Sequence, residues 1–441
     1  MRLLLIAYEF PPSPSPQSLR WSYLASELVR LGHEVHVLTI DLGGSGAGLP
    51  QLPAGVRVHR TYAGPVRGLM AAVRKRKARN AAAHDKTLQP AVAGPVRVHG
   101  ANWKKEAWDR LQEIAALVVF PDVRGEWYPW AYSEMNRLLR DLRPDVAISS
   151  HEPATTLQLG LLCRERGVPW LADMGDPVLA TYTPRQWRRK ARRLESAVCT
   201  AADHIIVTNS GAASLLAQRH GRSNGVSVLT QGYDGRRSAA LRPGSVVFDP
   251  DRLELLYTGS FYRFRRASAL LKAVAALPGV RLNIAAVTLP GEIVEAARRL
   301  PEQIRLLGFV PHLEVLQLQS HADVLVNIAN DEATQIPGKI YEYLGARRPI
   351  VHLSDDPDDT IGTLLRESSR GVSCANEAVS IAACLGTLLQ AKRTGPVQSW
   401  DVDSEAVVAC SWESLAKRLD ALLHEIKTPA HERQAAQPPP D

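Results

Sequence analysis

The sequence predicts an α/β protein with two domains, each built around a doubly wound parallel sheet. At 441 residues, the chain exceeds the length that one hydrophobic core usually supports. Short apolar runs alternate with segments of helical period, and strands that alternate with helices favour a parallel sheet covered on both faces. The alternation is interrupted in the aperiodic stretch 232–252 and then resumes. The two domains are expected to face each other across a cleft, which is a favoured place for a substrate site.

The first domain is predicted to span residues 1–235. It opens with a strand, a helix at 19–31 and a second strand. Ser18 is a suitable N-cap for that helix, and Gly32 suits the left-handed position after its end. The strands of this domain are predicted at 2–8, 34–40, 145–149, 169–173, 204–208 and 226–230.

The second domain is predicted at 253–397, after a linker at 236–252 that is rich in Gly, Pro, Arg and Asp. Residues 398–427 contain a helix with Ser411 as its N-cap, and we expect this part to pack back toward the first domain. The tail 428–441 is expected to be disordered. Strands are predicted at 253–259, 280–287, 304–310, 323–329 and 349–354, with helices at 267–276, 291–299 and 312–319.

Composition and motifs exclude several protein classes. No apolar stretch has the length of about 20 residues that a membrane-spanning helix needs, and the apolar N-terminus is too short for a signal peptide. The five cysteines are scattered, without a CxxC pair or a Cys/His cluster, so we expect free thiols and no metal site. The first βα loop has no GxGxxG motif, which argues against a dinucleotide oxidoreductase. We therefore expect a cytoplasmic protein that needs no metal or other cofactor.

Positive charge is concentrated in the first half of the chain. Residues 1–250 hold 33 Lys+Arg against 21 Asp+Glu, whereas residues 251–441 hold 20 against 24. No recognition-helix, RRM or KH signature accompanies this charge, so nucleic acid is not indicated as a partner. Two basic runs supply much of the excess, one from Arg67 to Arg79 and one from Arg185 to Arg193.

These basic runs fit two interpretations. Charge runs are most often ordinary solvated faces. Alternatively, they attract the anionic lipid headgroups at the inner face of the cell membrane, with apolar side chains as interfacial anchors. The candidate anchors are Leu69, Met70, Trp103, Trp108 and Trp187.

Ligands of open parallel sheets bind beyond the carboxyl ends of the strands, so the loops after the strands are the candidate sites. In the first domain, His151 follows a strand and precedes a helix, where it either reaches the cleft or satisfies local structure. Asp173 and Asp176 follow the next strand and either bind a hydroxylated acceptor or cap local backbone. Pro12 and Ser13 are further acceptor-side candidates, in a proline-rich loop ahead of a helix N-terminus whose dipole could face an anion. The prolines fit a rigid βα connection equally well.

The second domain offers a candidate diphosphate site. Gly259 ends a strand and is followed closely by Arg265 and Arg266. Glycine permits close approach of the backbone, and guanidinium groups match phosphate oxygens. Gly338 and Lys339 begin a predicted helix, where free N–H groups attract anions.

Glu342 is a carboxylate in an otherwise apolar segment, QIPGKIYEYLGARRPIV at 335–351. It follows Lys339 by three residues, which is less than one helical turn of about 3.6 residues. A ribose whose phosphates lie at the helix start would therefore place its hydroxyls within reach of this carboxylate. We therefore predict that this segment forms part of a nucleoside diphosphate site, with Lys339 near the phosphates and Glu342 near the ribose.

These motifs resemble the family-four retaining glycosyltransferases of the GT-B type, which have two Rossmann-like domains. The similarity covers nearly the whole chain, from RLLLIAYEFPP to GFVPHLEVLQLQSHADVLVNIA and PGKIYEYLGARRPIV, and the last block is the most specific. SSHEP at 149–153 is similar to the histidine segment of that family. This similarity implies that the imidazole of His151 acts near the donor sugar.

The resemblance also implies roles for other residues. Arg265 falls where the family has its diphosphate-binding lysine, and Glu342 matches the second glutamate of the E-x7-E motif, which holds the nucleotide ribose. Thr334 occupies the position of the first glutamate, so the usual contact with the donor sugar and the identity of that sugar are left open. Residues expected beside the donor sugar are Thr334, Ile336 and Pro337, and those expected beside the nucleobase are Gly308 and Val310.

The implied reaction transfers a sugar, such as a hexose, from a nucleoside diphosphate to an acceptor hydroxyl with retention of configuration. The basic first domain favours a lipid-linked or surface-polysaccharide acceptor over a small-molecule hydroxyl. Two alternatives stay open. One is a nucleotide-sugar epimerase of the same architecture. The other is a catalytically silent protein that binds nucleotide sugars or lipid headgroups, for which Thr334 is the main argument.

Overall fold

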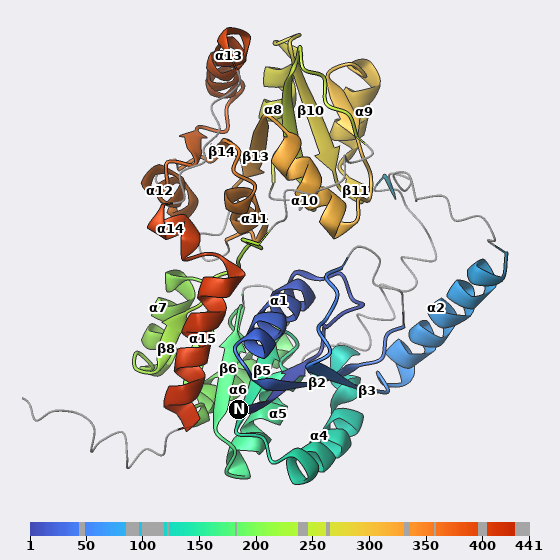
Figure 1. The fold of residues 1–441 in the computed structure, drawn as a ribbon, viewed down its shortest axis with the longest axis vertical. Helices are drawn as coiled ribbons and strands as arrows, with labels where there is room; N and C mark the ends of the chain where they lie inside the picture. Colours follow the sequence, from blue (N-terminus) through green and yellow to red (C-terminus); the bar gives the residue numbers. More distant parts are fainter. Residues whose placement is uncertain are drawn as a thin grey trace, which may run out of the picture. The chain divides into compact units, whose positions relative to one another are not determined.

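The computed structural model divides the chain into two compact units (Figure 1). The first unit comprises Met1–Thr87, Trp103–Thr230 and Trp412–Asp441, and the second comprises Leu88–Asn102 and Gln231–Ser411. The residues that the structure describes are 1–43, 49–84, 97–98, 119–120, 123–180, 183–236, 246–261, 265–329, 336–356, 359–395 and 404–427.

The first unit is built on seven parallel strands in the order β3-β2-β1-β5-β6-β7-β8. The strands are β1 (Arg2–Ala7), β2 (Glu34–Ile40), β3 (Val56–Thr61), β5 (Val146–His151), β6 (Trp170–Met174), β7 (His204–Val207) and β8 (Val226–Val228). The helices are α1 (Pro16–Arg30), α2 (Pro65–His84), α4 (Tyr128–Leu142), α5 (Thr155–Glu165), α6 (Arg188–Ala201), α7 (Ser210–His220) and α15 (Trp412–Lys427), with 3-10 turns η1 (Val123–Trp127) and η2 (Arg185–Trp187).

Both faces of this sheet are buried. Leu4 and Ile6 of β1 belong to one apolar cluster, together with residues of α4, α5, α6 and α7. Leu3 and Leu5 point to the opposite face and join a second cluster with α1 and α15, which lie side by side (Figure 1). The alternation follows from the two-residue period of a strand. A sheet covered on both faces is the doubly wound arrangement that the sequence predicts.

The first helix begins earlier than predicted. Ser15, rather than Ser18, is its N-cap, and the Ser15 side chain accepts a hydrogen bond of 3.1 Å from the Ser18 backbone N–H. Pro16 occupies the first helical position, where its missing N–H costs nothing. The prediction for the other end is confirmed, because Gly32 follows the helix with a φ of 89°.

The second unit is built on six parallel strands in the order β12-β10-β9-β13-β14-β15. The strands are β9 (Leu253–Thr258), β10 (Val280–Ala285), β12 (Ile304–Leu306), β13 (Val324–Ile328), β14 (Ile350–Leu353) and β15 (Gly371–Cys374), and β4 (Arg97–Val98) pairs separately with β11 (Thr288–Leu289). The helices are α8 (Ser268–Ala275), α9 (Gly291–Arg299), α10 (His312–His321), α11 (Lys339–Gly345), α12 (Thr360–Glu367), α13 (Ala378–Thr394) and α14 (Glu405–Val408).

This second sheet is also buried on both faces. Leu255 and Tyr257 of β9 pack in one cluster with α8, α9 and α13, while Leu256 packs in another with α10, α11 and α12. Two doubly wound parallel sheets in one chain confirm the predicted α/β fold class.

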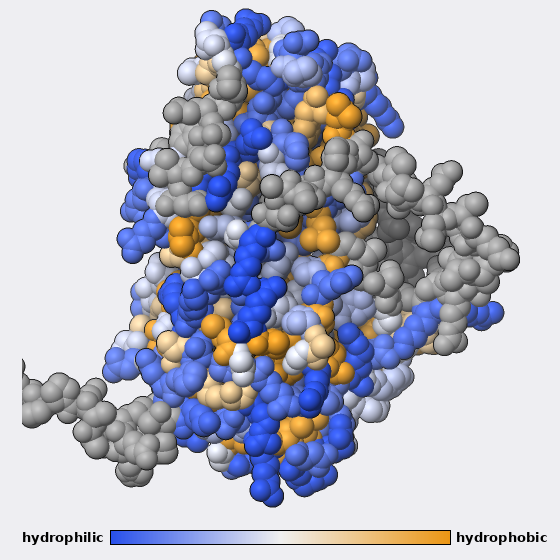
Figure 2. Space-filling model, viewed as in Figure 1, coloured by the Kyte–Doolittle hydropathy of each residue, from blue (hydrophilic) through white to orange (hydrophobic). Residues whose placement is uncertain are grey.

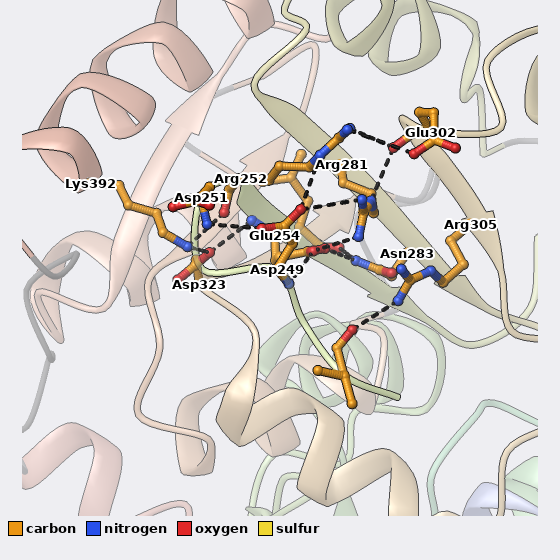
Figure 3. A network of polar contacts seen from close by, with 12 residues as sticks. Asp249, Asp251, Arg252, Glu254, Arg281, Asn283, Glu302, Arg305, Asp323 and Lys392 are labelled. Atoms are coloured by element: carbon orange, nitrogen blue, oxygen red, sulfur yellow. Dashed lines mark hydrogen bonds and ion pairs between the residues drawn. The ribbon is translucent and has the colours of Figure 1, made fainter. Parts of the chain in front are cut away.

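A polar network centred on the buried Glu254 lies at the amino ends of β9 and β10 in the second unit (Figure 3). Glu254 has no exposed area and accepts hydrogen bonds from Arg281 Nη1 at 3.1 Å and Asn283 Nδ2 at 2.6 Å. Its carboxylate also accepts the backbone N–H of Asp249 at 2.8 Å, and Lys392 forms an ion pair with Asp323. The network therefore fixes the segment before β9 to the edge of the sheet opposite the strand ends where a ligand would bind.

The chain passes between the units at Thr230–Gln231 and again at Ser411–Trp412. Among the predicted C-terminal helices, α14 belongs to the second unit and α15 to the first. Within the predicted linker, 237–245 lies outside the described residues, as does the tail 428–441.

Hydrophilic residues cover most of the described surface in the view of Figure 2, and apolar residues form separate patches between them. Among the helices of the described ranges, none is long and apolar enough to cross a membrane.

Candidate functional site

His151 is the last residue of β5, and its side chain is almost fully buried at the carboxyl end of the first sheet. Its Nδ1 lies 2.9 Å from the backbone carbonyl oxygen of Asp176. A carbonyl oxygen only accepts, so Nδ1 must carry the proton, and the neutral imidazole then has its lone pair on Nε2. Among the residues that the structure describes, none hydrogen-bonds to this Nε2. The imidazole thus has a fixed tautomer and one nitrogen available for a ligand.

The backbone of this segment is held by the first helix. Gln17, in the first turn of α1, donates its Nε2 to the carbonyl oxygen of His151 at 2.7 Å and also contacts the hydroxyl of Ser150. Ser150 and His151 belong to β5, which neighbours β1 in the sheet. The β1–α1 loop and the end of β5 therefore meet at one edge, as parallel strands require.

Asp173 is held by structural contacts rather than exposed to an acceptor. Its side chain has no exposed area, and its Oδ2 accepts from Trp21 Nε1 at 2.8 Å and pairs with Arg20 Nε at 3.4 Å. Burial raises the pKa of Asp173, and the charge of Arg20 opposes that rise. Arg20 also donates to the carbonyl oxygens of Leu229 and Thr230. The ion pair with Asp173 connects α1 to β6, and the two hydrogen bonds to Leu229 and Thr230 connect α1 to the segment after β8.

The remaining candidates of the first unit lie near His151. Asp176 is half-buried and contributes its backbone carbonyl, while Pro12 and Ser13 are half-buried in the β1–α1 loop. The Ser13 backbone N–H donates to the carbonyl of Phe10 at 3.1 Å, which closes a turn ahead of the helix. None of these contacts defines an acceptor, so the acceptor-side role of these residues stays a prediction.

In the second unit, three residues from different elements form what we call the cation cluster: Tyr257, Arg265 and Lys339. Lys339 Nζ lies 3.5 Å from the centroid of the Tyr257 ring. Arg265 is buried, and its Nη1 donates to the carbonyl of Ser260 at 2.7 Å and reaches the Tyr257 hydroxyl at 3.4 Å. The arrangement arises because β9 and β13 are neighbours, so the segments after their carboxyl ends meet.

The charge of Lys339 is poorly compensated. Its Nζ is buried and has no hydrogen-bond partner among the described residues, although the residue as a whole is half-buried. Burial is the main reason that the pKa of Lys339 lies well below its usual value, and the neighbouring charge of Arg265 lowers it further. Glu342 opposes both effects. An anion bound here would supply the acceptor that Lys339 Nζ lacks among the described residues.

Gly259 and Gly338 line the same region. Gly259 has a φ of 101°, and a side chain there would start 3.8 Å from Lys339 Cδ. Gly338 is the residue before α11, and an added Cβ would lie 3.3 Å from Gln231 Cγ. Arg266 points elsewhere, because its exposed guanidinium pairs with the exposed Asp355. The structure therefore brings Gly259, Arg265 and Lys339 together and leaves Arg266 outside the group.

Glu342 lies one turn into α11, with 24% of its side chain exposed. Its Oε2 is 3.4 Å from Gln319 Nε2, and its Oε1 is 3.8 Å from His312 Nδ1. Both partners belong to α10, so the carboxylate is directed toward that helix. Tyr341 and Tyr343, on either side, are buried.

Hydrogen bonds link Gln319, the partner of Glu342, to Thr258 and Tyr343. Gln319 Nε2 also reaches Thr258 Oγ1 at 3.3 Å, and the Thr258 backbone N–H donates to the Tyr343 hydroxyl at 2.9 Å. Burial raises the pKa of Tyr343, so its hydroxyl stays protonated. Sequence reasoning missed Tyr257, Thr258 and Gln319, because a tyrosine, a threonine and a glutamine on separate elements form no motif.

The other predicted donor-side residues lie near this group in sequence. Gly308 is buried with a φ of 68°, just after β12, and Val310 is half-buried ahead of α10. Ile336 is half-buried and Pro337 is buried. Thr334 lies outside the described residues, as do Trp103 and Trp108 of the predicted membrane anchors.

The described residues contain no group of three or more His, Cys, Asp or Glu side chains arranged to hold a metal ion. All five cysteines are free thiols.

Known structures share this fold over nearly their whole length. Sucrose-phosphate synthase from Thermosynechococcus elongatus matches with a TM-score of 0.65 at 15% identity, covering 97% of this chain and 99% of that chain. HepE from Anabaena, in complex with UDP, matches with 0.59 at 12% identity, covering 96% and 100%. WaaG, a glycosyltransferase involved in lipopolysaccharide biosynthesis, matches with 0.55 at 13% identity, covering 96% and 99%. At these identities the likeness shows the fold, which is that of the GT-B glycosyltransferases.

The two doubly wound units thus have the fold of the GT-B glycosyltransferases. In sequence, residues 17–232 match the family described as "Glycosyl transferase 4-like domain". The first unit is therefore a glycosyl transferase 4-like domain, and the predicted family-four resemblance is confirmed. No curated protein matches the chain significantly in sequence.

Proposed function

We propose that the protein is a retaining glycosyltransferase that moves a sugar from a nucleoside diphosphate donor to an acceptor hydroxyl. The observation that carries the proposal is the cation cluster, in which Lys339 Nζ is buried beside Arg265 and lacks a hydrogen-bond partner among the described residues. Burying a charge without a partner costs free energy. A diphosphate would supply both the opposite charge and the missing acceptors.

Structures of similar fold support a uridine nucleotide as the donor. Structures of HepE contain UDP in one case, and UDP with glucose in another, at TM-scores of 0.59. These proteins share no more than 13% identity with this chain, so the base and the sugar of its own donor are part of the proposal.

The proposed chemistry rests on positioning and on charge. Arg265 and Lys339 offset the charge that develops on the departing diphosphate, and Glu342 accepts hydrogen bonds from the ribose. In the proposed reaction, His151 acts on the sugar through its Nε2. The bond between the anomeric carbon and the diphosphate breaks, the acceptor oxygen bonds to the same face of the sugar, and the proton of the acceptor hydroxyl passes to the departing diphosphate. No metal or other cofactor is assigned to these steps.

The proposed acceptor is a lipid-linked or surface-polysaccharide intermediate at the inner face of the cell membrane. Helix α2 contains six Lys and Arg residues and no Asp or Glu. Leu69 and Val73, one turn apart on α2, are 67% and 48% exposed. Basic and apolar side chains on one helix favour an anionic membrane surface. Trp187 contributes less to such a surface, because its ring packs against Phe120 at 5.5 Å.

Incubation with a panel of radiolabelled nucleotide sugars and a membrane extract tests this proposal. We expect the label to enter lipid or polysaccharide with one donor, and the product linkage to retain the donor's configuration. Release of free epimerised donor would identify an epimerase instead. Thermal stabilisation by a donor without any turnover would identify a silent binding protein.

A further inference from the structure

We propose that Gln319 is a positioning residue that aims the carboxylate of Glu342 at the nucleotide. This inference rests on the proposed role of Glu342 in donor binding. Gln319 lies on α10, has no exposed area and therefore cannot touch the donor itself. Any effect of Gln319 on the donor must pass through the residues that it contacts.

The contacts of Gln319 place its amide between two polar groups. Its Nε2 is 3.4 Å from Glu342 Oε2 and 3.3 Å from Thr258 Oγ1. Thr258 is fixed in turn, since its Oγ1 lies 3.1 Å from the hydroxyl of the buried Tyr343. Glu342 and Tyr343 are neighbours on α11, so this chain connects two positions of that helix through β9 and α10. Gln319 of α10 thus contacts the carboxylate and is itself held by Thr258 of β9.

The direction of the amide follows from the charge of Glu342. If the amide were reversed, its oxygen would face a carboxylate oxygen, and two acceptors would repel each other. The NH2 group must therefore face Glu342. This orientation leaves Gln319 Oε1 buried without a hydrogen-bond partner among the described residues.

That unpartnered oxygen indicates that the amide is not present for packing. A leucine or methionine would fill a similar volume without burying an unsatisfied acceptor. The cost of the amide is offset only by what its NH2 group does, and that group reaches Thr258 and Glu342. Fixing a side chain before the ligand arrives lowers the entropy cost of binding.

A second residue of α10 supports the same picture. His312 lies seven positions before Gln319, which is close to two helical turns, so both side chains share one face of the helix. His312 Nδ1 is 3.8 Å from Glu342 Oε1, whereas Gln319 contacts Oε2. Two side chains on one face of α10 therefore lie next to the two carboxylate oxygens of Glu342.

A double-mutant cycle on the full-length protein tests the inference. The affinities for UDP, GDP and ADP are measured calorimetrically for the wild-type protein, and the tightest ligand is carried through Gln319→Leu, Glu342→Ala and the double variant. We expect Glu342→Ala to weaken binding strongly. We expect Gln319→Leu to weaken binding about 5- to 10-fold when Glu342 is present and less than about 2-fold when it is absent.

Gln317→Leu is the matched control, because this half-buried glutamine lies two positions away on the same helix and faces another direction. It should leave the affinity unchanged. Thermal melting establishes that each variant is folded, and Gln319→Met replaces Gln319→Leu if the latter is not.

An equal loss from Gln319→Leu with and without Glu342 would overturn the positioning role and leave the donor proposal intact. Failure of the folded wild-type protein to bind any of the three nucleotides would overturn the donor proposal, and the positioning role with it.

Discussion

The ammonium group of Lys339 lies over the ring of Tyr257, with its Nζ 3.5 Å from the ring centroid. The ring face attracts the cation, but it does not neutralise the charge as a carboxylate would. Arg265, which also reaches Tyr257, adds a second positive charge. The protein thereby holds two cations in a buried place where they disfavour each other, and a bound anion would relieve that cost.

Replacing Lys339 by methionine should separate binding from stability. We expect Lys339→Met to weaken UDP binding about 10- to 100-fold, because a desolvated cation–phosphate contact is lost. The same change should leave the melting temperature unchanged or raise it, since a poorly compensated buried charge is removed. Lys272→Met, at an exposed position of α8, is the control for both measurements. A fall in stability together with unchanged UDP affinity would contradict the assignment.

Binding should also depend on pH in a defined direction. Burial and Arg265 hold the pKa of Lys339 well below its usual value, and Glu342 is the facing charge that opposes them. Above that lowered pKa the free site lacks its ammonium proton, so anion binding requires proton uptake. UDP affinity should therefore fall as the pH rises through the pKa of Lys339. Calorimetry in buffers of different ionisation enthalpy measures this uptake, and Lys339→Met should abolish it.

His151 should affect turnover far more than nucleotide binding. Its Nδ1 is fixed by the Asp176 carbonyl, and only Nε2 is left to act on the sugar. We expect His151→Ala to lower kcat about 10²-fold, because a positioned hydrogen-bond acceptor for the reacting groups is lost. The affinity for UDP should change less than about 2-fold, because the proposed nucleotide contacts lie in the other unit. A weakened UDP affinity with normal kcat would assign His151 to nucleotide binding instead.

The network around Glu254 should govern stability and not donor binding. Arg281→Met leaves the fully buried carboxylate of Glu254 without its ion partner. We expect the unfolding free energy of the second unit to fall by about 3–5 kcal/mol. Arg298→Met breaks the exposed pair with Glu295, 74% and 55% exposed, and should cost less than about 1 kcal/mol. Denaturant unfolding compares the two variants, and equal losses would refute the prediction.

Membrane association can be tested with vesicles of defined charge. We expect the protein to sediment with vesicles that contain phosphatidylglycerol and not with pure phosphatidylcholine, and added salt should release it. Leu69→Ser combined with Val73→Ser should reduce this binding. Val379→Ser, on α13 of the second unit, is the control, since this valine is 82% exposed and its helix has no part in the basic runs. Absence of binding to either vesicle would remove the membrane from the proposal.

Local signals predicted most of the fold. The strand at 34–40 was predicted with the bounds that β2 has, and the helix at 291–299 with those of α9. The start of α1 was misplaced, because Ser15 and Ser18 are both good caps and only Pro16 distinguishes them. The strands β3 and β15 were missed, since they are half-exposed edge strands without a continuous apolar run.

The sequence by itself determined two doubly wound domains and the family, because hydrophobic period, turn residues and the PGKIYEYLG block are local features. Tertiary structure decided which charges are paired. Asp173 and Glu342 are both acidic residues within candidate site segments. Asp173 is fully buried against Arg20 and Trp21, whereas the side chain of Glu342 stays partly exposed beside α10. Lys339 and Arg265 became neighbours only because β9 and β13 lie side by side in the sheet. Pairing across elements depends on the sheet order, which no local pattern encodes.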